Sequence, residues 1–133
     1  MAAGNRIVEG ILQSPAHQLL SGSTALVRYR GRRSDRVVTT PVQWAGDAAE
    51  LVVLVAHPDR KRWWRNFVDG HEVEVLVRRR WLPMHGLVVD PASDPTEAER
   101  LLATYLGRFP KASKVAAGAV LVRCHPAAAP ASR

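Results

Sequence analysis

The sequence lacks most of the groups that would tie it to a covalent or metal-based class. Cys124 is the single cysteine, so no disulfide can form within one chain. Because there are no cysteine pairs and the histidines have no ligand-like spacing, we expect no metal site. The scattered histidines are His17, His57, His71, His85 and His125.

Long apolar segments are also missing. No stretch approaches the roughly 20 apolar residues needed to span a bilayer. Residues 1–20 lack the continuous apolar core and the small-residue cleavage site of a signal peptide. These absences make a cytoplasmic protein the default expectation, and the lone cysteine neither supports nor requires an oxidising compartment.

Motifs for familiar catalysis are absent as well. There is no glycine-rich dinucleotide fingerprint, no P-loop and no paired carboxylates, because Glu72 and Glu74 lie on one predicted strand face as solvated groups. Cys124 is expected to be an inert core thiol. No catalytic residue can be assigned, and Tyr29, His57 and solvent all stay open as proton donor. A protein of this kind fits chemistry that a bound cofactor supplies.

Acidic residues are scarce relative to basic ones. Nineteen Lys and Arg stand against 12 Asp and Glu, a formal net charge of +7, in a chain of 133 residues that suits one domain. Twelve of these cations fall within 28–36, 60–65 and 78–80. Such clusters favour an anionic partner: a phosphate-bearing small molecule, nucleic acid or an anionic membrane. The alternative is an arginine-rich surface that only faces solvent.

Hydrophobic periodicity predicts a mainly β domain. Alternating patterns over 26–30, 37–44, 72–77 and 81–89, an apolar run over 50–57 and a final segment over 115–123 predict six strands. The residues 45–47 look like a turn, and 61–68 like a short helix. Six strands in mostly sequential order, with short helices between them, indicate a small antiparallel barrel in the α+β class.

Single residues add detail to this scheme. Pro41 cannot donate to a strand ladder, so we expect it at a sheet edge or bulge. Leu76 is expected to face outward, opposite its valine neighbours. Asp94, Pro95 and Glu97 predict a capped helix start, with the helix ending near residue 108.

The chain divides into three parts in this scheme. Residues 1–20 are expected to form an N-terminal helical arm, because Ile7, Val8, Ile11 and Leu12 have helical spacing before Pro15 interrupts it. Residues 21–125 form the barrel. The Ala/Pro-rich residues 126–133 are expected to be a disordered tail. Peripheral membrane contact through the arm stays open, although the arm carries few cations.

The loop 31–36 is the first candidate binding element. A glycine followed by polar residues between two strands makes a turn whose N–H groups can converge on an anion. Arg32, Arg33 and Arg36 add bidentate donors, and Ser34 adds a hydroxyl. The alternative is a charged hairpin loop without a ligand.

Residues 59–67 are the second candidate. Trp63 and Trp64 stand among four cations, and adjacent helical positions point about 100° apart. One indole therefore faces the core and the other a groove, where Lys61 or Arg65 can hold an acidic group. The alternative is that both indoles cover the open end of the barrel.

Two motifs together resemble the deazaflavin-dependent nitroreductase and quinone reductase family. They are Gly31-Arg32-Arg33-Ser34 with Pro41-Val42 ten residues after the glycine, and Lys61-x-Trp63-Trp64-x-Asn66-Phe67. The resemblance covers about residues 17–124. It implies a split β-barrel, as in flavin-reductase-like proteins, coenzyme F420 as cofactor, and hydride transfer from the reduced deazaflavin to quinones, nitro-compounds or activated alkenes.

The resemblance also implies site residues. Arg32, Arg33 and Ser34 would hold the phosphate and acidic tail, and Arg36 would replace a basic residue that the family has at the position of Val38. The deazaflavin ring would be lined and closed in by Thr40, Pro41, Val42, Val55, Ala56, His57, Lys61, Trp63 and Trp64. Asp35 stands where the family usually has glycine, so its carboxylate must point away or pair with Arg36.

Other ligands fit the same barrel. FMN has one phosphate and no glutamate tail, so the excess of arginines favours F420 over FMN, while a flavin or haem-type ligand bound without turnover is a further alternative. Single-stranded nucleic acid is a weaker candidate because the strands lack a row of exposed aromatics. Split barrels often pair across one face, so we expect a homodimer.

Overall fold

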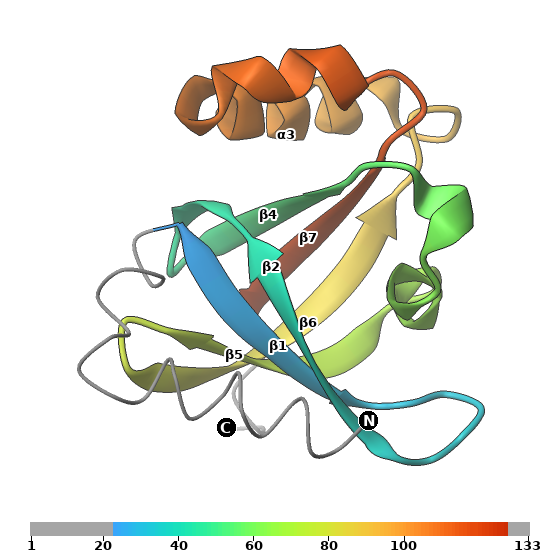
Figure 1. Cartoon of the computed structure of the whole chain (residues 1–133), viewed down its shortest axis with the longest axis vertical. Helices are drawn as coiled ribbons and strands as arrows, with labels where there is room; N and C mark the ends of the chain where they lie inside the picture. Colours follow the sequence, from blue (N-terminus) through green and yellow to red (C-terminus); the bar gives the residue numbers. More distant parts are fainter. Residues whose placement is uncertain (1–22, 128–133) are drawn as a thin grey trace, which may run out of the picture.

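The computed structural model describes residues 23–127, of which most form one antiparallel sheet (Figure 1). Its strands are β1 (Thr24–Arg30), β2 (Val37–Gln43), β3 (Ala45–Asp47), β4 (Glu50–Val55), β5 (His71–Val77), β6 (Arg80–Val89) and β7 (Val120–Pro126). The helical elements are α3 (Pro95–Arg108) and three 3₁₀ segments, η1 (Pro58–Arg60), η2 (Trp63–Phe67) and η3 (Pro110–Val115). The arm predicted over 1–20 and residues 128–133 of the predicted tail lie outside the described residues.

The strand order makes the sheet curl. Strands run β2-β1-β5-β6-β7-β4-β3, so β2 and β3 form the two edges. These edges are consecutive in the chain, and Trp44 is the one residue between them. The edges must therefore meet at Trp44, which closes one end of the barrel. Pro41 lies on the edge strand β2, as predicted.

The barrel is open on the other side of Trp44. Strand β3 covers only Glu50–Val52 of β4, and β2 pairs with β1 alone among the described strands. Residues Val53–Val55 of β4 consequently have β7 on one side and no strand on the other. The prediction of a mainly β split barrel is confirmed, and the split runs between β2 and β4.

The strand count was wrong by one. Ala45–Asp47 was expected to be a turn, but it forms β3, which pairs antiparallel with β4. The turn comes two residues later, where the Asp47 carboxylate accepts hydrogen bonds from the N–H groups of Ala49 and Glu50. Gly46 has a φ of 100°, a backbone conformation that glycine alone adopts readily. The sequence of this short strand therefore resembled that of a turn, because it contains a glycine.

Two further boundaries differ from the predictions. The short helix predicted over 61–68 is the 3₁₀ segment η2, which is limited to Trp63–Phe67. The last strand begins at Val120 instead of residue 115, because η3 and a turn at Gly118 come first. It also extends through Pro126, beyond the predicted end of the barrel, and the Ala127 N–H donates to the Pro83 carbonyl at 3.0 Å.

The core has two main parts. Alternate residues of the strands fill the barrel interior around Phe67, which is 1% exposed. On the outer face, α3 packs through Leu101 and Tyr105 onto β3, β4 and β7. Leu76 does leave the barrel interior, but it is buried against Leu26 with Trp81 packed beside it.

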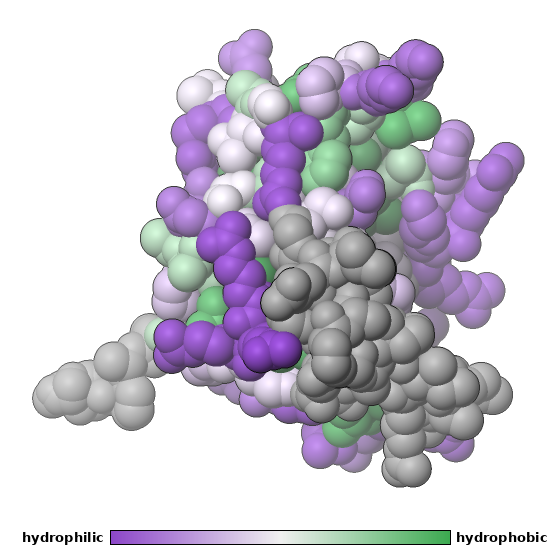
Figure 2. All heavy atoms as spheres, turned by 60° about the vertical axis from the view of Figure 1, so that its left-hand side comes forward, coloured by the Kyte–Doolittle hydropathy of each residue, from purple (hydrophilic) through white to green (hydrophobic). Residues whose placement is uncertain are grey.

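The start of α3 follows its sequence signals. The Asp94 side chain accepts a hydrogen bond from the Glu97 N–H, and Pro95 is the first helical residue. Within residues 23–127, no helix has the length and apolar character needed to cross a membrane. The space-filling view shows hydrophobic atoms just below the level of α3, bordered by hydrophilic side chains (Figure 2).

Candidate functional site

The loop between β1 and β2 is closed by its own hydrogen bonds. The Gly31 N–H donates to the Arg36 carbonyl at 2.7 Å, and the Asp35 N–H donates to the Gly31 carbonyl at 2.9 Å. The Ser34 hydroxyl accepts from the Arg36 N–H at 3.2 Å. A Cβ on Gly31 would lie 2.5 Å from the Ser34 Oγ, so a side chain at this position would displace that hydroxyl. Its three arginines, Arg32, Arg33 and Arg36, are exposed.

Asn66 joins this loop to η2. Its Oδ1 accepts from the Arg32 N–H at 2.8 Å, and its Nδ2 donates to the Trp63 carbonyl at 2.9 Å. One side chain thereby links the loop to the backbone of η2 at Trp63. Asn66 belongs to the second sequence motif, but it was not among the predicted site residues. The signal that marks it is its place in the motif, three residues after Trp63.

A cavity of about 490 Å³ lies between the loop and η2. We call it the arginine pocket, because Arg32, Arg33, Arg62 and Arg65 line it. Its other lining residues include Tyr29, Ser34, Val38, Thr40, Trp63 and Asn66, and none of them is acidic. The pocket therefore presents four cations without a carboxylate in its wall, which favours an anionic ligand.

Tyr29 lines the arginine pocket next to Thr40. Burial raises the pKa of the Tyr29 hydroxyl, and the hydrogen bond with the Thr40 side chain lowers it by less. Tyr29 is 5% exposed and packs edge-on against Phe67 at a ring separation of 5.2 Å. Its hydroxyl is therefore neutral at physiological pH and can donate a hydrogen bond.

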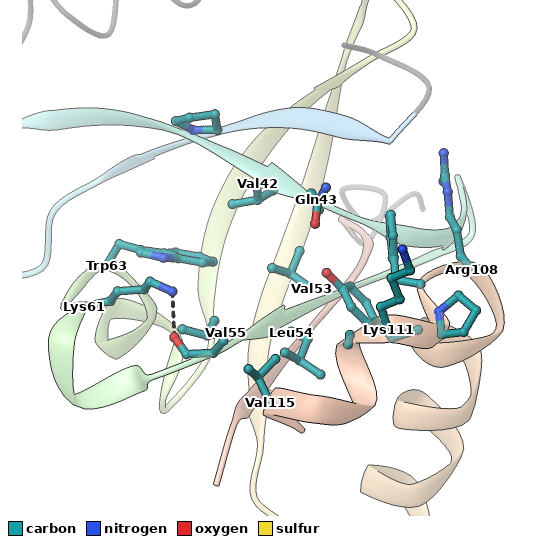
Figure 3. A pocket seen from close by; sticks show the side chains of 16 residues that line it. Val42, Gln43, Val53, Leu54, Val55, Lys61, Trp63, Arg108, Lys111 and Val115 are labelled. Carbon is teal, nitrogen blue, oxygen red and sulfur yellow. Dashed lines mark hydrogen bonds between the residues drawn. The ribbon is translucent and has the colours of Figure 1, made fainter. Parts of the chain in front are cut away.

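A larger cavity of about 800 Å³ occupies the split between β2 and β4. We call it the apolar slot. Figure 3 shows Val42 and Gln43 on one wall and Val53, Leu54 and Val55 on the other. Pro41, Ala56 and residues of α3 and η3 complete the lining, which contains no acidic side chain. Ligand pockets in proteins span roughly 300–1,000 Å³, so the slot has the size of a cofactor or substrate site.

Trp63 connects the two cavities, since it lines both. Lys61 lies beside it at the same end of the slot, where its Nζ donates to the Ala56 carbonyl at 2.6 Å (Figure 3). A molecule with an anionic part and a planar apolar part can therefore lie across Trp63. Its anion would contact the arginine pocket, and its ring system would enter the slot.

Ten of the thirteen predicted site residues line one of these cavities. Arg32, Arg33, Ser34 and Thr40 line the arginine pocket. Six others line the slot, with Trp63 shared: Pro41, Val42, Val55, Ala56, Lys61 and Trp63. Segments that are far apart in the sequence thus meet as the two motifs predict.

The structure does not bring the other three into either lining. His57 is exposed, at a left-handed φ of 51°, at the start of η1. Trp64 faces a different surface cavity and donates its indole N–H to the Pro58 carbonyl at 2.9 Å. Arg36 is exposed outside the arginine pocket.

Asp35 does not pair with Arg36. Its carboxylate lies 3.7 Å from the Arg30 guanidinium, and its backbone carbonyl accepts from the same side chain at 2.8 Å. The acidic group is therefore turned out of the arginine pocket, and its negative charge does not oppose an anion there.

Four further cations belong to the cavities. Arg65 was predicted to be able to hold an acidic group and does line the arginine pocket, whereas Arg62, of the same basic cluster, was not assigned to the site. Arg108 and Lys111 line the slot from the end of α3 and from η3. Nothing local marks the latter two, because only the packing of α3 brings them to the split.

Cys124 is part of the barrel core. It is buried, and burial raises the pKa of its thiol to about 12. The prediction that Cys124 lies in the core is confirmed. Within residues 23–127, no group of three or more His, Cys, Asp or Glu residues is placed to hold a metal ion.

Comparisons with known proteins identify the fold. No family model matches the chain, and no curated protein matches its sequence. Solved structures do match. The chain has a split-barrel fold. A domain-swapped dimer superposes with a TM-score of 0.63 at 13% identity, covering 93% of this chain and 98% of that one.

Two other solved structures share this fold. Protein Atu2129 from Agrobacterium tumefaciens, of unknown function, gives a TM-score of 0.56 at 16% identity, over 93% of this chain and 54% of that one. The FAD and haem binding protein from Mycobacterium smegmatis gives a TM-score of 0.50 at 15% identity, over 86% of this chain and 67% of that one. At these identities the likeness establishes the fold alone.

Proposed function

We propose that the arginine pocket and the apolar slot together bind a phosphate-bearing redox cofactor, with coenzyme F420 as the first candidate. The observation that carries this proposal is the position of Trp63, which lines an acid-free cationic pocket on one side and an apolar slot on the other. F420 has the matching division into a planar ring and an acidic tail. The chain would then act as a reductase.

The residues present fit such a cofactor. Guanidinium groups suit phosphate because their planar fork donates two parallel hydrogen bonds. Arg32, Arg33 and the Ser34 hydroxyl would hold the phosphate, and Arg62 and Arg65 the acidic tail. In the slot, Trp63 offers an indole for stacking. Bound and reduced, F420 would supply a hydride to a quinone, nitro-compound or activated alkene.

FMN is the alternative within the same site. A structural neighbour binds FAD and haem, so a flavin or haem-type ligand on this fold has a precedent at the level of the fold. Four arginines around one pocket exceed what a single phosphate needs, which favours the longer acidic tail of F420. Direct comparison of the two cofactors decides between them.

The test is a fluorescence titration of the purified protein with F420 and, in parallel, FMN. Trp63 supplies the signal, because a ligand that stacks beside it quenches its emission. Preferential F420 binding supports the proposal, and preferential FMN binding moves the protein to flavin chemistry. If neither binds below tens of micromolar, the enzyme hypothesis is abandoned and single-stranded nucleic acid is tested next.

A charge-matched pair of variants tests the assignment of residues. Arg32→Ala with Arg33→Ala is expected to weaken cofactor binding about 100-fold, since each removes charge-assisted hydrogen bonds. Arg60→Ala with Lys114→Ala removes the same charge from exposed positions outside both linings and should leave the affinity within about twofold. Equal losses in the two variants would mean that net charge, not this pocket, binds the cofactor.

We also propose a homodimer. One structural neighbour is a domain-swapped dimer, and the likeness covers nearly all of both chains. Light scattering on the purified protein should give twice the chain mass of 14.6 kDa. A value of one chain mass would rule the dimer out.

A further inference from the structure

The far end of the apolar slot carries two cations that the cofactor proposal does not use. Arg108 is the last residue of α3, and Lys111 lies on η3. Figure 3 shows both at the end of the slot opposite Trp63 and Lys61. The slot is therefore apolar in its middle and positively charged at each end.

Neither cation is neutralised by the protein. In the part of the chain from 23 to 127, all ion pairs lie elsewhere, and neither Arg108 nor Lys111 has a carboxylate within 4.0 Å. A cation at a helix C-terminus stabilises the helix dipole, which is one reason for Arg108 to be where it is. That reason does not extend to Lys111, which is exposed beyond the helix end.

Arg108 is held in place while keeping most of its donors. Its guanidinium lies 4.6 Å from the centre of the Trp44 ring, and its Nη1 donates to the Trp44 carbonyl at 3.2 Å. A guanidinium has five N–H donors, so others remain available. Trp44 is 3% exposed and forms the closed end of the split, which makes it a rigid support.

We propose that the slot binds a second ligand with a planar apolar body and an anionic group such as a carboxylate, and that Arg108 and Lys111 bind the anion. The proposal rests on the proposed function in one respect: this ligand would be the electron acceptor of the reductase. It narrows the acceptors from quinones, nitro-compounds and activated alkenes in general to those that carry an acidic substituent.

The physical argument concerns desolvation. An anion that enters an apolar cleft loses hydration and binds only where a charged partner replaces that water. Val42, Val53 and Leu54 provide no such partner along the slot walls, whereas Arg108 and Lys111 provide two at one end. An anionic ligand should therefore bind more tightly at this end of the slot than a neutral ligand of the same shape, because of these two side chains.

Two fluorescent probes with the same aromatic body test this without any cofactor. Anilinonaphthalene sulfonate carries an anion, and N-phenylnaphthylamine is its neutral counterpart. The wild-type protein should bind the sulfonate at least about tenfold more tightly, the effect of a charge-assisted hydrogen bond. Equal affinities, or no binding of the sulfonate, would overturn the proposal.

Single-residue variants test which cations bind the sulfonate. Lys111→Glu should weaken sulfonate binding at least about tenfold and leave the neutral probe unchanged. Lys114→Glu is the matched control, because it makes the same charge change on η3 outside the slot lining. Arg108→Gln should repeat the result of Lys111→Glu, with its folding checked by circular dichroism because Arg108 also contacts Trp44.

Three results contradict the assignment. They are equal losses for Lys111→Glu and Lys114→Glu, a loss for both probes, and a loss that appears instead when Arg33 and Arg62 are replaced by Gln. The last would place the probe in the arginine pocket. The outcome is also separable from the cofactor proposal, since Arg33→Gln with Arg62→Gln should lower F420 or FMN affinity and leave sulfonate binding unchanged.

Discussion

Positive side chains beside α3 contact carboxylates, whereas most of those that line the arginine pocket do not. Beside α3, Arg100 donates to both Glu50 carboxylate oxygens at 2.8 and 2.7 Å and to Glu97 at 2.9 and 2.7 Å. Arg123 donates to Glu97 at 2.8 Å, and His125 lies 3.0 Å from Glu50. Each of these three side chains has an acidic partner.

The arginines of the arginine pocket have almost no acidic partners. Of its four arginines, Arg32 alone has an acidic neighbour in the described part of the chain, with its guanidinium 3.9 Å from the exposed Asp69 carboxylate. Because no acidic side chain lines this pocket, its positive charge is not cancelled locally. The uncancelled positive charge of the arginine pocket produces a local potential that attracts anions.

The largest change in cofactor affinity is expected from reversing charge in the arginine pocket. Arg62→Glu with Arg65→Glu should lower cofactor affinity by more than about 100-fold, because two favourable contacts become two repulsive ones. Thermal stability should change little, since both side chains are exposed. Titration and melting of the same preparations measure both. A large loss of stability with unchanged affinity would mean that these two arginines stabilise the fold and do not bind the cofactor.

Asn66→Ala tests how the free cations are positioned. It removes the hydrogen bonds to the Arg32 N–H and the Trp63 carbonyl, so we expect a loss of about 1–2 kcal/mol in unfolding free energy and about tenfold in cofactor affinity. Urea unfolding and titration measure the two. Asn66→Asp keeps the acceptor but adds a negative charge, so it should restore part of the stability and none of the affinity.

Glu97→Gln tests the paired cations. It leaves Arg100 and Arg123 with a weaker partner, and we expect a loss of about 1 kcal/mol in unfolding free energy, the order of magnitude for screened surface pairs. Glu99→Gln makes the same change at an exposed position of α3 and should have no effect. Cofactor affinity should be unchanged in both, and a loss of affinity in Glu97→Gln would mean that the two regions are coupled.

Acid should weaken the paired region with a defined sign. Hydrogen bonds from Arg100 hold the pKa of both Glu50 and Glu97 down at about 2, from an ordinary value of 4.5. A lowered folded pKa contributes stability above the unfolded pKa and loses it as pH falls through the folded one. Stability should therefore decline between about pH 4.5 and 2, and by less in Glu97→Gln. An equal decline in that variant would assign the effect to other carboxylates.

Local signals predicted most of the fold. The alternating segments form β1, β2, β5 and β6, because apolar residues every second position need one buried face. The cap at Asp94 and the proline after it start α3 at the expected residue. The mistakes fall where glycine or 3₁₀ turns interrupt a pattern, at β3 and before β7, since short strands without alternation have no local signature.

The structure brings some of the predicted site residues together at the two cavities and leaves others outside them. The two motifs identified the arginine loop and Trp63, which the structure brings to one cleft. They also included Arg36 and Trp64, which point elsewhere, because neighbours in sequence face different directions on a tight loop or a 3₁₀ turn. Arg108 and Lys111 were missed because they reach the slot from another element.

The sequence by itself determined a basic, mainly β chain with an inert cysteine, an arginine loop closed by Gly31 and a capped helix. These follow from composition and from interactions over a few residues, which act in any context. The tertiary structure alone decided which cations have partners. Glu50 meets Arg100 across 50 residues, and Arg108 reaches a slot walled by β2 and β4. Such pairings depend on how the sheet curls at Trp44, and no local pattern encodes that.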